Sequence, residues 1–207
     1  MQTLVTFEAP FDPAKVEARD VRLSLVPRGA TQALQVESGH AQEWPGITLP
    51  APTGKWDLTA FAAVEIDVRN TDTKRVTVCC RVDNPGGDGS KNCLTRSVEV
   101  EPGAQALLAV PLLRPPPPAA PKLFGMRGYP EGLAPGGAGL DVTNVTQLIV
   151  FVPRPRADHR FEISPVRAVG AARPLGFAAM PAAELFPMID EFGQFVHRDW
   201  PGKAHSE

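Results

Sequence analysis

The middle of the chain carries two runs in which every second side chain is apolar and the ones between are mostly polar. The first, residues 61–70, reads FAAVEIDVRN, and the second, residues 75–84, reads RVTVCCRVDN. A period of two places alternate side chains on opposite faces of a β-strand, which is typical of a strand with one buried face. Between the runs, Asn70, Thr71 and Asp72 favour a turn. We therefore predict an antiparallel hairpin with one apolar face in a core and one charged face outside.

Proline and glycine argue against a mainly helical fold. The 207 residues include 23 prolines and 18 glycines, and a proline inside a helix removes a hydrogen bond and clashes with the preceding turn. Short period-two segments separated by turn residues are typical of sandwiches and jelly rolls. We predict an all-β protein, an antiparallel β-sandwich of the jelly-roll type, with Trp56 closing one end. Besides the central pair, strands are expected in residues 2–8, 21–26, 33–37, 47–49, 94–100, 106–113, 145–152 and 160–169.

Two of these predicted strands have features that bear on their place in a sheet. Residues 145–152 are strongly apolar, which predicts a central strand covered on both faces. Residues 160–169 contain Pro165, which lacks an N–H for a sheet ladder and therefore predicts a bulge or an edge. The pattern does not determine which strands pair.

The chain is expected to form one β-sandwich domain, residues 1–170, followed by a different segment, residues 171–207. The proline run at 114–121 predicts an extended polyproline arm, either a linker between domains or an excursion within one. We favour the excursion because strand patterns resume at Val145. The residues from 171 onward are aromatic and charged without periodicity, and they predict an irregular C-terminal strap that packs on this sandwich or on a following domain.

Charge and hydropathy argue against two classes of partner. The formal net charge is -2, which gives no basic surface for nucleic acid, and no apolar run approaches the ~20 residues of a membrane span. The first residues show no signal peptide, so the localisation stays open: cytoplasmic, or secreted or periplasmic if a leader has been removed. For Cys79, Cys80 and Cys93 we expect free thiols first, one Cys79–Cys93 disulfide second and a metal site last, with Cys80 in the core.

Several segments resemble carbohydrate-binding jelly-roll domains of the galactose-binding-like type. They are Phe7-Glu8, Trp44-Pro45-Gly46, Trp56-Asp57-Leu58, residues 65–70 and Phe161-Glu162-Ile163. Two longer segments are more specific: LFGMRGYP at 123–130 and FPMIDEFGQFVHRDWPGK at 186–203 are similar to the amino-terminal module of exo-acting β-agarases and their glycoside hydrolase relatives.

This resemblance implies an accessory role. In that family the second segment leads into a (β/α)8 catalytic barrel that carries the two catalytic glutamates, and the present sequence stops at Glu207, before any barrel. We therefore expect a non-catalytic module that binds a polysaccharide or oligosaccharide of the galactan or agaro-oligosaccharide type, with a C-terminal catalytic domain in cis. The alternatives are a purely structural domain that buttresses the barrel, and an independent enzyme.

Sugar binding requires flat aromatic faces for the C–H side of a pyranose and planar polar groups for its hydroxyls. We expect these to meet at one rim of the sandwich if the 85–93 loop folds over. The alternative is that Trp44 fills the core and Arg127 pairs with a carboxylate. The candidate residues are Trp44, Arg81, Asp83, Asn84, Asn92, Arg127 and Tyr129.

No cofactor is expected to be required, although a structural calcium ion would suit Glu8, Glu37 and Glu162 if they cluster. Ser164 stands where related modules carry an aspartate, which weakens that site. Asp67 and Asp83 could approach on adjacent strands, but we do not expect them to hydrolyse glycosides. The charged side chains of the central pair are expected to stabilise the sheet by cross-strand pairing; they are Glu65, Asp67, Arg69, Arg81 and Asp83.

Overall fold

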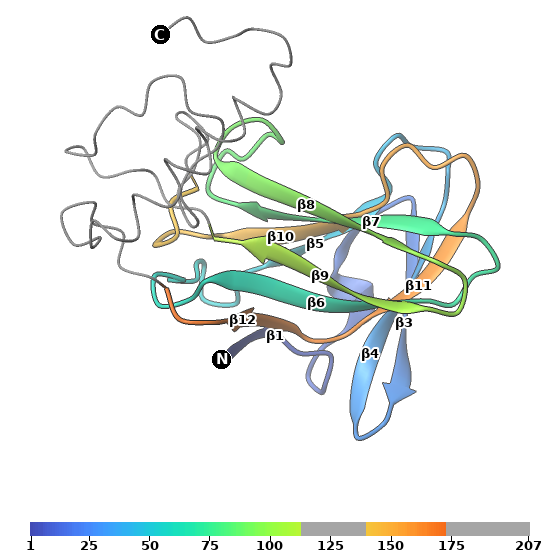
Figure 1. Ribbon diagram of the computed structural model, residues 1–207, viewed down its shortest axis with the longest axis horizontal. Coiled ribbons are helices and arrows are strands. Elements are labelled where there is room, and N and C mark those ends of the chain that lie inside the picture. The colour runs from blue at the N-terminus through green and yellow to red at the C-terminus, as the bar shows by residue number, and fades with distance from the viewer. Residues whose placement is uncertain (113–139, 173–207) are drawn as a thin grey trace, which may run out of the picture.

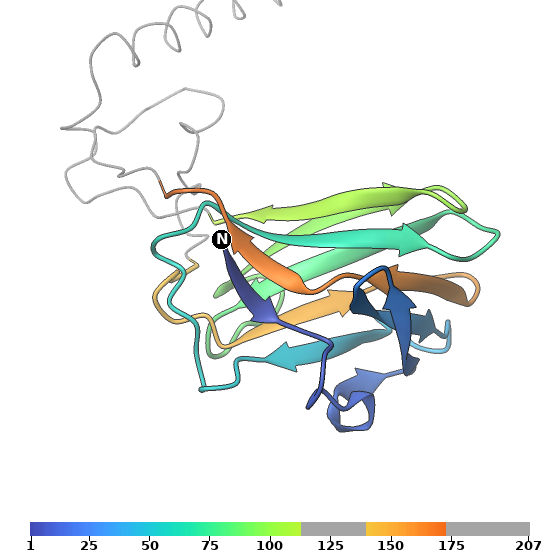
Figure 2. The ribbon, with the colours of Figure 1, turned by 90° about the horizontal axis from the view of Figure 1, so that it is seen from below.

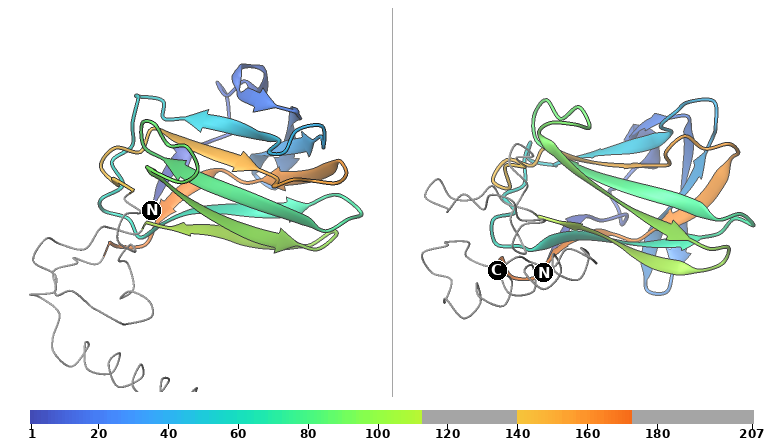
Figure 3. Two further views of the ribbon diagram at one scale, coloured as in Figure 1. Left: turned by 90° about the horizontal axis from the view of Figure 1, so that it is seen from above. Right: turned by 45° about the horizontal axis from the view of Figure 1, so that its top comes forward.

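The computed structural model describes residues 1–112 and 140–172, which form two antiparallel sheets packed face to face (Figure 1). The strands are β1 (Gln2–Val5), β2 (Glu17–Arg19), β3 (Val21–Arg28), β4 (Thr31–Ser38), β5 (Gly46–Pro50), β6 (Ala63–Asn70), β7 (Val76–Asp83), β8 (Cys93–Val100), β9 (Gln105–Pro111), β10 (Gln147–Phe151), β11 (His159–Ile163) and β12 (Val166–Val169). The seven-stranded sheet has the order β1-β12-β6-β11-β4-β3, with β9 also paired to β6. The five-stranded sheet has the order β2-β5-β10-β7-β8 (Figure 3, left). The predicted antiparallel β-sandwich is confirmed.

The core lies between the two sheets, where the apolar halves of the alternating strands meet. Ile66 and Phe161 from the larger sheet and Cys80 and Leu148 from the smaller one are all fully buried. Trp56 closes one end as predicted, since it is 7% exposed and its backbone pairs with that of Val145. Burying each such side chain stabilises the fold by about 1.5–3 kcal/mol.

The predicted hairpin of residues 61–70 and 75–84 is wrong, because the two strands lie in different sheets. β6 pairs with β9, β11 and β12, whereas β7 pairs with β8 and β10. The turn between them therefore crosses from one sheet to the other, a gap of about 10 Å. Both strands bury their apolar faces in the same core, but from opposite sides. An alternating sequence pattern is the same for this arrangement and for a hairpin, so it could not distinguish between them.

The expected last strand, residues 160–169, is divided in two at Pro165, and the predicted edge position is wrong because β11 and β12 each lie between two other strands. β11 pairs with β4 and with the end of β6, and β12 pairs with β1 and with the start of β6. At the break, the Ser164 hydroxyl accepts the N–H of Asp67 at 2.9 Å, and the Ser164 N–H donates to the Asp67 carbonyl at 3.0 Å. These two bonds pair the backbone N–H and carbonyl of Asp67 in β6, beside the position where Pro165 has no N–H to donate.

β10 is central in its sheet, as predicted, but its two faces differ. Leu148 and Val150 are buried, whereas Gln147, Ile149 and Phe151 on the other face are only half-buried. The short strand β2 was not predicted. Within 1–112 and 140–172 the helical structure is one 3-10 turn at Pro13–Lys15, and no helix there is long and apolar enough to cross a membrane.

The three cysteines carry free thiols, as expected, and Cys80 is fully buried. Burial raises the pKa of Cys79 to about 11 and that of Cys80 to about 12. Neither thiol is ionised near neutral pH, so neither is primed for nucleophilic chemistry. The polyproline arm and most of the C-terminal strap lie outside the described residues.

Candidate functional site

One surface of the sandwich combines an exposed indole with a fixed guanidinium: the outer face of the five-stranded sheet. Register places Gly46, Phe151 and Cys79 in one row across β5, β10 and β7, and places Pro50, Gln147 and Asp83 in another. The rows are four residues apart along β10, or about 13 Å. We call the first row the aromatic end and the second the polar end. The half-buried side chains of this face include Thr48, Arg81, Thr95, Gln147, Ile149 and Phe151.

Trp44 stands at the aromatic end and is 44% exposed. Its ring meets that of Phe151 edge to face, with 5.8 Å between centroids. The Arg154 guanidinium lies 5.2 Å from the centroid of the indole, within the range of a cation–π contact. The indole is therefore held by two neighbours while much of its surface stays open to solvent. The alternative in which Trp44 fills the core is therefore wrong.

Backbone pairing and one glycine set the position of this indole. The Val152 N–H donates to the Pro45 carbonyl at 3.0 Å and the Arg154 N–H to the Glu43 carbonyl at 2.6 Å. A Cβ on Gly46 would stand 2.6 Å from the Phe151 Cβ, closer than side chains approach. Glycine at this position therefore lets Phe151 reach Trp44.

Arg81 is the centre of the polar end. Its Nε and Nη2 donate to the two oxygens of Asp83 at 2.8 and 2.9 Å, and Gln147 Nε2 donates to the same carboxylate at 3.0 Å. Asp83 is fully buried, while the Arg81 side chain is 19% exposed. Burial favours a lower pKa for Arg81, but the hydrogen bonds and charge of Asp83 outweigh it and raise that pKa. Arg81 is thus a cation fixed in orientation at the surface.

The 85–93 loop folds over this guanidinium, which was the condition set for these residues to meet. A Cβ on Gly89 would stand 3.1 Å from Arg81 Nη1, and the Asn84 N–H donates to the Asn92 carbonyl at 2.9 Å. The Asn84 side chain is occupied elsewhere, because it donates to the carbonyls of Asp141 and Asn144, both at 2.7 Å. Asn84 therefore ties two loops together, whereas Asn92 is exposed and able to meet a ligand.

The sequence-predicted site residues thus separate into three groups. Arg81, Asp83, Asn84 and Asn92 come together at the polar end, where Asp83 and Asn84 serve as supports. Trp44 lies at the other end of the same face, so the expectation of one shared rim is wrong for this residue. Arg127 and Tyr129 lie outside the described residues. Three residues that complete the face were not predicted: Gln147, Phe151 and Arg154.

The three glutamates proposed for calcium have separate partners. Glu8 Oε1 accepts the N–H of Gln32 at 2.7 Å, Glu37 Oε1 accepts from Gln35 Nε2 at 3.2 Å, and Glu162 lies 3.8 Å from Arg69. Over residues 1–112 and 140–172, no group of three or more histidine, cysteine, aspartate or glutamate side chains is arranged to hold a metal ion.

The charged residues expected to share one strand face do not do so. Glu65, Asp67 and Arg69 on β6 point away from the core, on the outer face of the seven-stranded sheet. There the Asp67 carboxylate accepts a hydrogen bond from Arg167 at 3.0 Å. Arg81 and Asp83 belong to the outer face of the other sheet. The body of the sandwich therefore separates Asp67 from Asp83, and they cannot act as a carboxylate pair.

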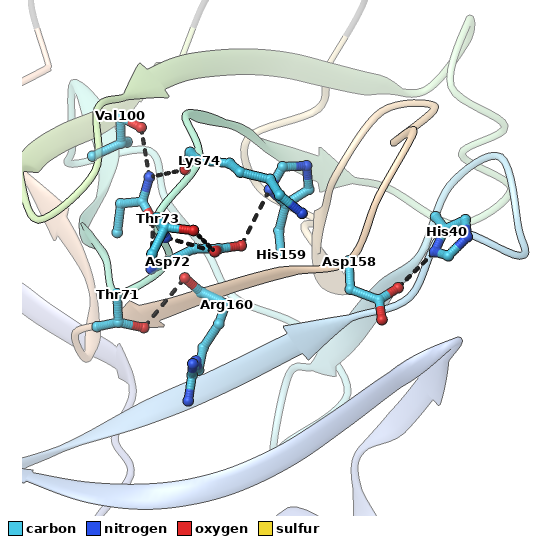
Figure 4. Close-up of polar contacts among 10 residues, drawn as sticks. His40, Thr71, Asp72, Thr73, Lys74, Val100, Asp158, His159 and Arg160 are labelled. Carbon is cyan, nitrogen blue, oxygen red and sulfur yellow. Dashed lines mark hydrogen bonds and ion pairs between the residues drawn. The ribbon is translucent and has the colours of Figure 1, made fainter.

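A second polar region was not predicted: a depression of about 820 Å³ at one end of the sandwich. We call it the end pocket. It lies where the β6–β7 and β10–β11 loops turn, at the right-hand end of Figure 1. Figure 4 shows its two ion pairs, His40–Asp158 at 2.6 Å and His159–Asp72 at 3.7 Å. Its lining residues are Asp20, Val21, Arg22, Glu37, Ser38, Gly39, His40, Ala41, Asp72, Lys74, Asp158, His159 and Arg160.

His159 predicts a pH dependence of stability. Burial lowers its pKa below 6.5, and the nearby Asp72 carboxylate offsets this only in part. Below that pH the unfolded chain binds a proton that the folded chain does not, so stability falls as pH decreases. We expect the thermal midpoint to fall between about pH 7.5 and about pH 5.5, and to fall less in His159→Gln. Asp72 does not obscure this effect, because its own pKa is lowered from 3.8 and it titrates below this window.

The matched control for this measurement is His40→Gln, since the His40 side chain is 56% exposed. An identical pH dependence in wild type and His159→Gln would contradict the assignment.

Comparison with known proteins places this fold among modules of carbohydrate-active enzymes. No protein-family model matches the chain. The chain is 24% identical over 189 residues to β-agarase B of Vibrio sp. (strain JT0107), covering 82% of this chain and 19% of that protein. A solved exo-β-agarase matches with a TM-score of 0.61 and 14% identity, over 83% of this chain and 26% of that one.

A stand-alone module gives a nearly full-length match. It is the family 11 carbohydrate-binding module of the Clostridium thermocellum cellulase Lic26A-Cel5E, with a TM-score of 0.54, 15% identity, and coverage of 84% of this chain and 97% of that one. This family of module has also been solved with a β-1,3-1,4-mixed-linked tetrasaccharide. The predicted resemblance to the β-sandwich modules of agarase-type enzymes is confirmed. The chain spans about a fifth of the curated agarase.

Proposed function

We propose that this chain is a non-catalytic carbohydrate-binding module that holds a galactan chain, such as an agaro-oligosaccharide, on the outer face of its five-stranded sheet. The observation that carries the proposal is the presence of an exposed, fixed indole and a fixed guanidinium on the same outer sheet face, where Arg81 pairs in register with Ile149, two residues along β10 from Phe151. The Trp44 ring offers a stacking surface for the C–H side of a sugar, and Arg81 offers oriented donors for hydroxyls. The half-buried Thr48 and Thr95 add hydroxyls on the same sheet.

Two further points support this proposal. The named relatives include a β-agarase and a carbohydrate-binding module solved with a tetrasaccharide. Because the chain spans only 19% of that agarase and 26% of the exo-β-agarase structure, we propose that it works beside a catalytic domain in cis. The outer face would keep a polysaccharide near that domain.

The test is calorimetric titration of the full chain with agarotetraose. Wild type is expected to bind, and Trp44→Ala to weaken binding tenfold or more, since losing an aromatic contact of about 1.4 kcal/mol changes affinity tenfold. The fold should survive, because Trp44 is a surface residue. Leu107→Ala is the matched control: Leu107 is 48% exposed but lies on β9, in the other sheet.

Two results would count against the proposal: no binding of agarotetraose, or equal binding by wild type and Trp44→Ala. Either would favour the structural role in which the module only supports its neighbour. A parallel titration with a β-1,3-1,4-linked glucan tetrasaccharide tests the preference for galactan, because stronger binding of the glucan would remove that part of the proposal.

A further inference from the structure

The end pocket is built from four separate segments: residues 20–22, residues 37–41, the 72–74 turn and residues 158–160. Residues 39–41 form one wall, the 72–74 turn forms another, and β11 begins between them at His159. A volume of about 820 Å³ lies in the range of small-molecule sites. Its lining is mostly polar or charged, which suits a ligand rich in hydroxyl groups; because it contains no phenylalanine, tyrosine or tryptophan, binding here would depend on hydrogen bonds and not on ring stacking.

Asp20 fixes the first wall. Its carbonyl accepts the N–H of Gly39 at 2.8 Å, and its carboxylate accepts those of Ala41 and Gln42 at 2.9 and 3.1 Å. A Cβ on Gly39 would collide with the Asp20 carboxylate. The loop therefore closes tightly on Asp20, and His40 is carried on a defined backbone.

Asn70 fixes the second wall. It is fully buried, and its amide donates to the carbonyls of Lys74 and Val100 at 2.7 and 2.8 Å, while its oxygen accepts the Asp72 N–H at 2.8 Å. The same turn is tied to β11, because the Thr71 hydroxyl donates to the Arg160 carbonyl at 3.2 Å (Figure 4) and the Thr71 N–H donates to it at 3.1 Å. A pocket with fixed walls loses little entropy on binding.

Three polar groups of the pocket form no hydrogen bond within the described residues, although His159 Nδ1 lies 3.7 Å from the Asp72 carboxylate. The Ser38 hydroxyl, on a residue 2% exposed, and His159 Nδ1 make no hydrogen bond. Lys74 is exposed, and its ammonium forms no hydrogen bond or ion pair with any residue of the described ranges. Buried polar groups are normally paired, so the enclosed Ser38 hydroxyl lacks a partner that it would ordinarily have, while the exposed Lys74 ammonium is open to a ligand.

The signs of the charges separate the ligand classes. The lining has four carboxylates and three permanent cations, and the Arg160 side chain points away from His159 (Figure 4). The permanent cations of the pocket are therefore outnumbered by its carboxylates, which disfavours a sulfate or phosphate ester. Carboxylates accept from hydroxyl groups while Lys74 and imidazole donate to them, so mixed signs suit a neutral polyol.

The pocket adjoins the aromatic end of the outer face through one loop. Residues 39–41 line the pocket and Trp44 follows three residues later on the face. Arg19 Nη2 also donates to Gln42 Oε1 at 2.9 Å, linking β2 to this loop. A saccharide lying along the face would thus reach the pocket where it passes Trp44.

We propose that the end pocket binds one terminal hexose unit of a neutral saccharide, as a subsite separate from the sheet face. Its role at the end of a bound chain rests on the proposed function, whereas its affinity for a single hexose does not. The pocket would give the module a preference for chain ends that a flat face alone lacks.

The test is nuclear magnetic resonance of the full chain titrated with D-galactose, followed through backbone amide shifts. We expect saturable shifts in residues 39–41, 72–74 and 158–160, with those near Arg81 unchanged. Lys74→Met combined with Asp158→Asn should weaken galactose binding at least tenfold, while Trp44→Ala leaves it within twofold. Lys55→Met is the matched control, because Lys55 is an exposed lysine on another loop.

Three other outcomes would contradict the proposed subsite. Absence of shifts up to the solubility limit of galactose would do so, and so would shifts that the double variant leaves unchanged. Stronger shifts with inorganic phosphate than with galactose would assign the pocket to anions instead. Because agarotetraose binding is measured on Trp44→Ala, failure of the sheet face and failure of the pocket give different results.

Discussion

Replacing Asp83 with alanine is expected to lower the free energy of unfolding by about 3 kcal/mol. The fully buried carboxylate accepts from both Arg81 and Gln147, so its removal leaves a guanidinium and an amide without their partner. Breaking a buried pair on one side costs more than the pair contributes, because the remaining charge stays poorly solvated. Asp83→Asn keeps the shape of the side chain and one acceptor oxygen, so its free energy of unfolding should fall by about half as much as that of Asp83→Ala.

Urea unfolding of the wild type, Asp83→Ala and Asp83→Asn measures this loss of stability. The comparison variant is Glu99→Ala, which removes a partner of Arg75 on the neighbouring strand at 3.2 Å, where both side chains are more than half exposed. Such surface pairs contribute about 0–1 kcal/mol. Equal losses in Asp83→Ala and Glu99→Ala would mean that the polar end is not a fixed, buried support.

Replacing Asn70 with alanine is also expected to lower the free energy of unfolding by about 3 kcal/mol. This side chain satisfies two carbonyls and one N–H where the chain crosses between the sheets. Each group left unpaired in the interior costs about 1–3 kcal/mol, and the 71–74 turn loses its anchor. The end pocket should lose its galactose affinity in the same variant.

Gln105→Ala provides the control, because Gln105 is an exposed amide at the start of β9 and surface substitutions usually change stability by less than about 0.5 kcal/mol. Thermal unfolding followed by circular dichroism gives the stability, and the galactose titration gives the pocket. A stable Asn70→Ala protein with full galactose affinity would show that the turn holds its shape without this side chain.

Alternation predicted the buried faces of the strands well, because burial acts on each strand separately. Val64, Ile66 and Val68 are all fully buried, as the period-two pattern indicated. Pairing could not be predicted in the same way. A strand with one apolar face fits either sheet, and the choice between them depends on strands that are distant in sequence.

The outer face was only partly predictable. Trp44 and Arg81 were found because aromatic and planar polar residues at loops and strand ends suggest sugar binding. Phe151 was missed, because an almost continuous apolar run hides the alternation that places it outside. The pattern of Gln147, Ile149 and Phe151 against Leu148 and Val150 was the available signal.

The end pocket could not be predicted from the sequence. His40 lies in a segment that reads as an ordinary turn, and His159 is separated from it by more than a hundred residues. Asn70 was recognised for its turn propensity, but its bond to the Val100 carbonyl depends on β8 and on the crossing between sheets. Tertiary proximity, which leaves no local pattern, creates this site.

The break at Pro165 has a consequence for how the chain folds during synthesis. Because β12 lies between β1 and β6 (Figure 2), β1 is synthesised long before β12, the strand with which it pairs in the described part of the chain. Such pairing between distant segments slows folding and keeps intermediates open for longer. Stepwise release of nascent chains should therefore show protease resistance arising abruptly once Val166–Val169 has emerged, rather than strand by strand.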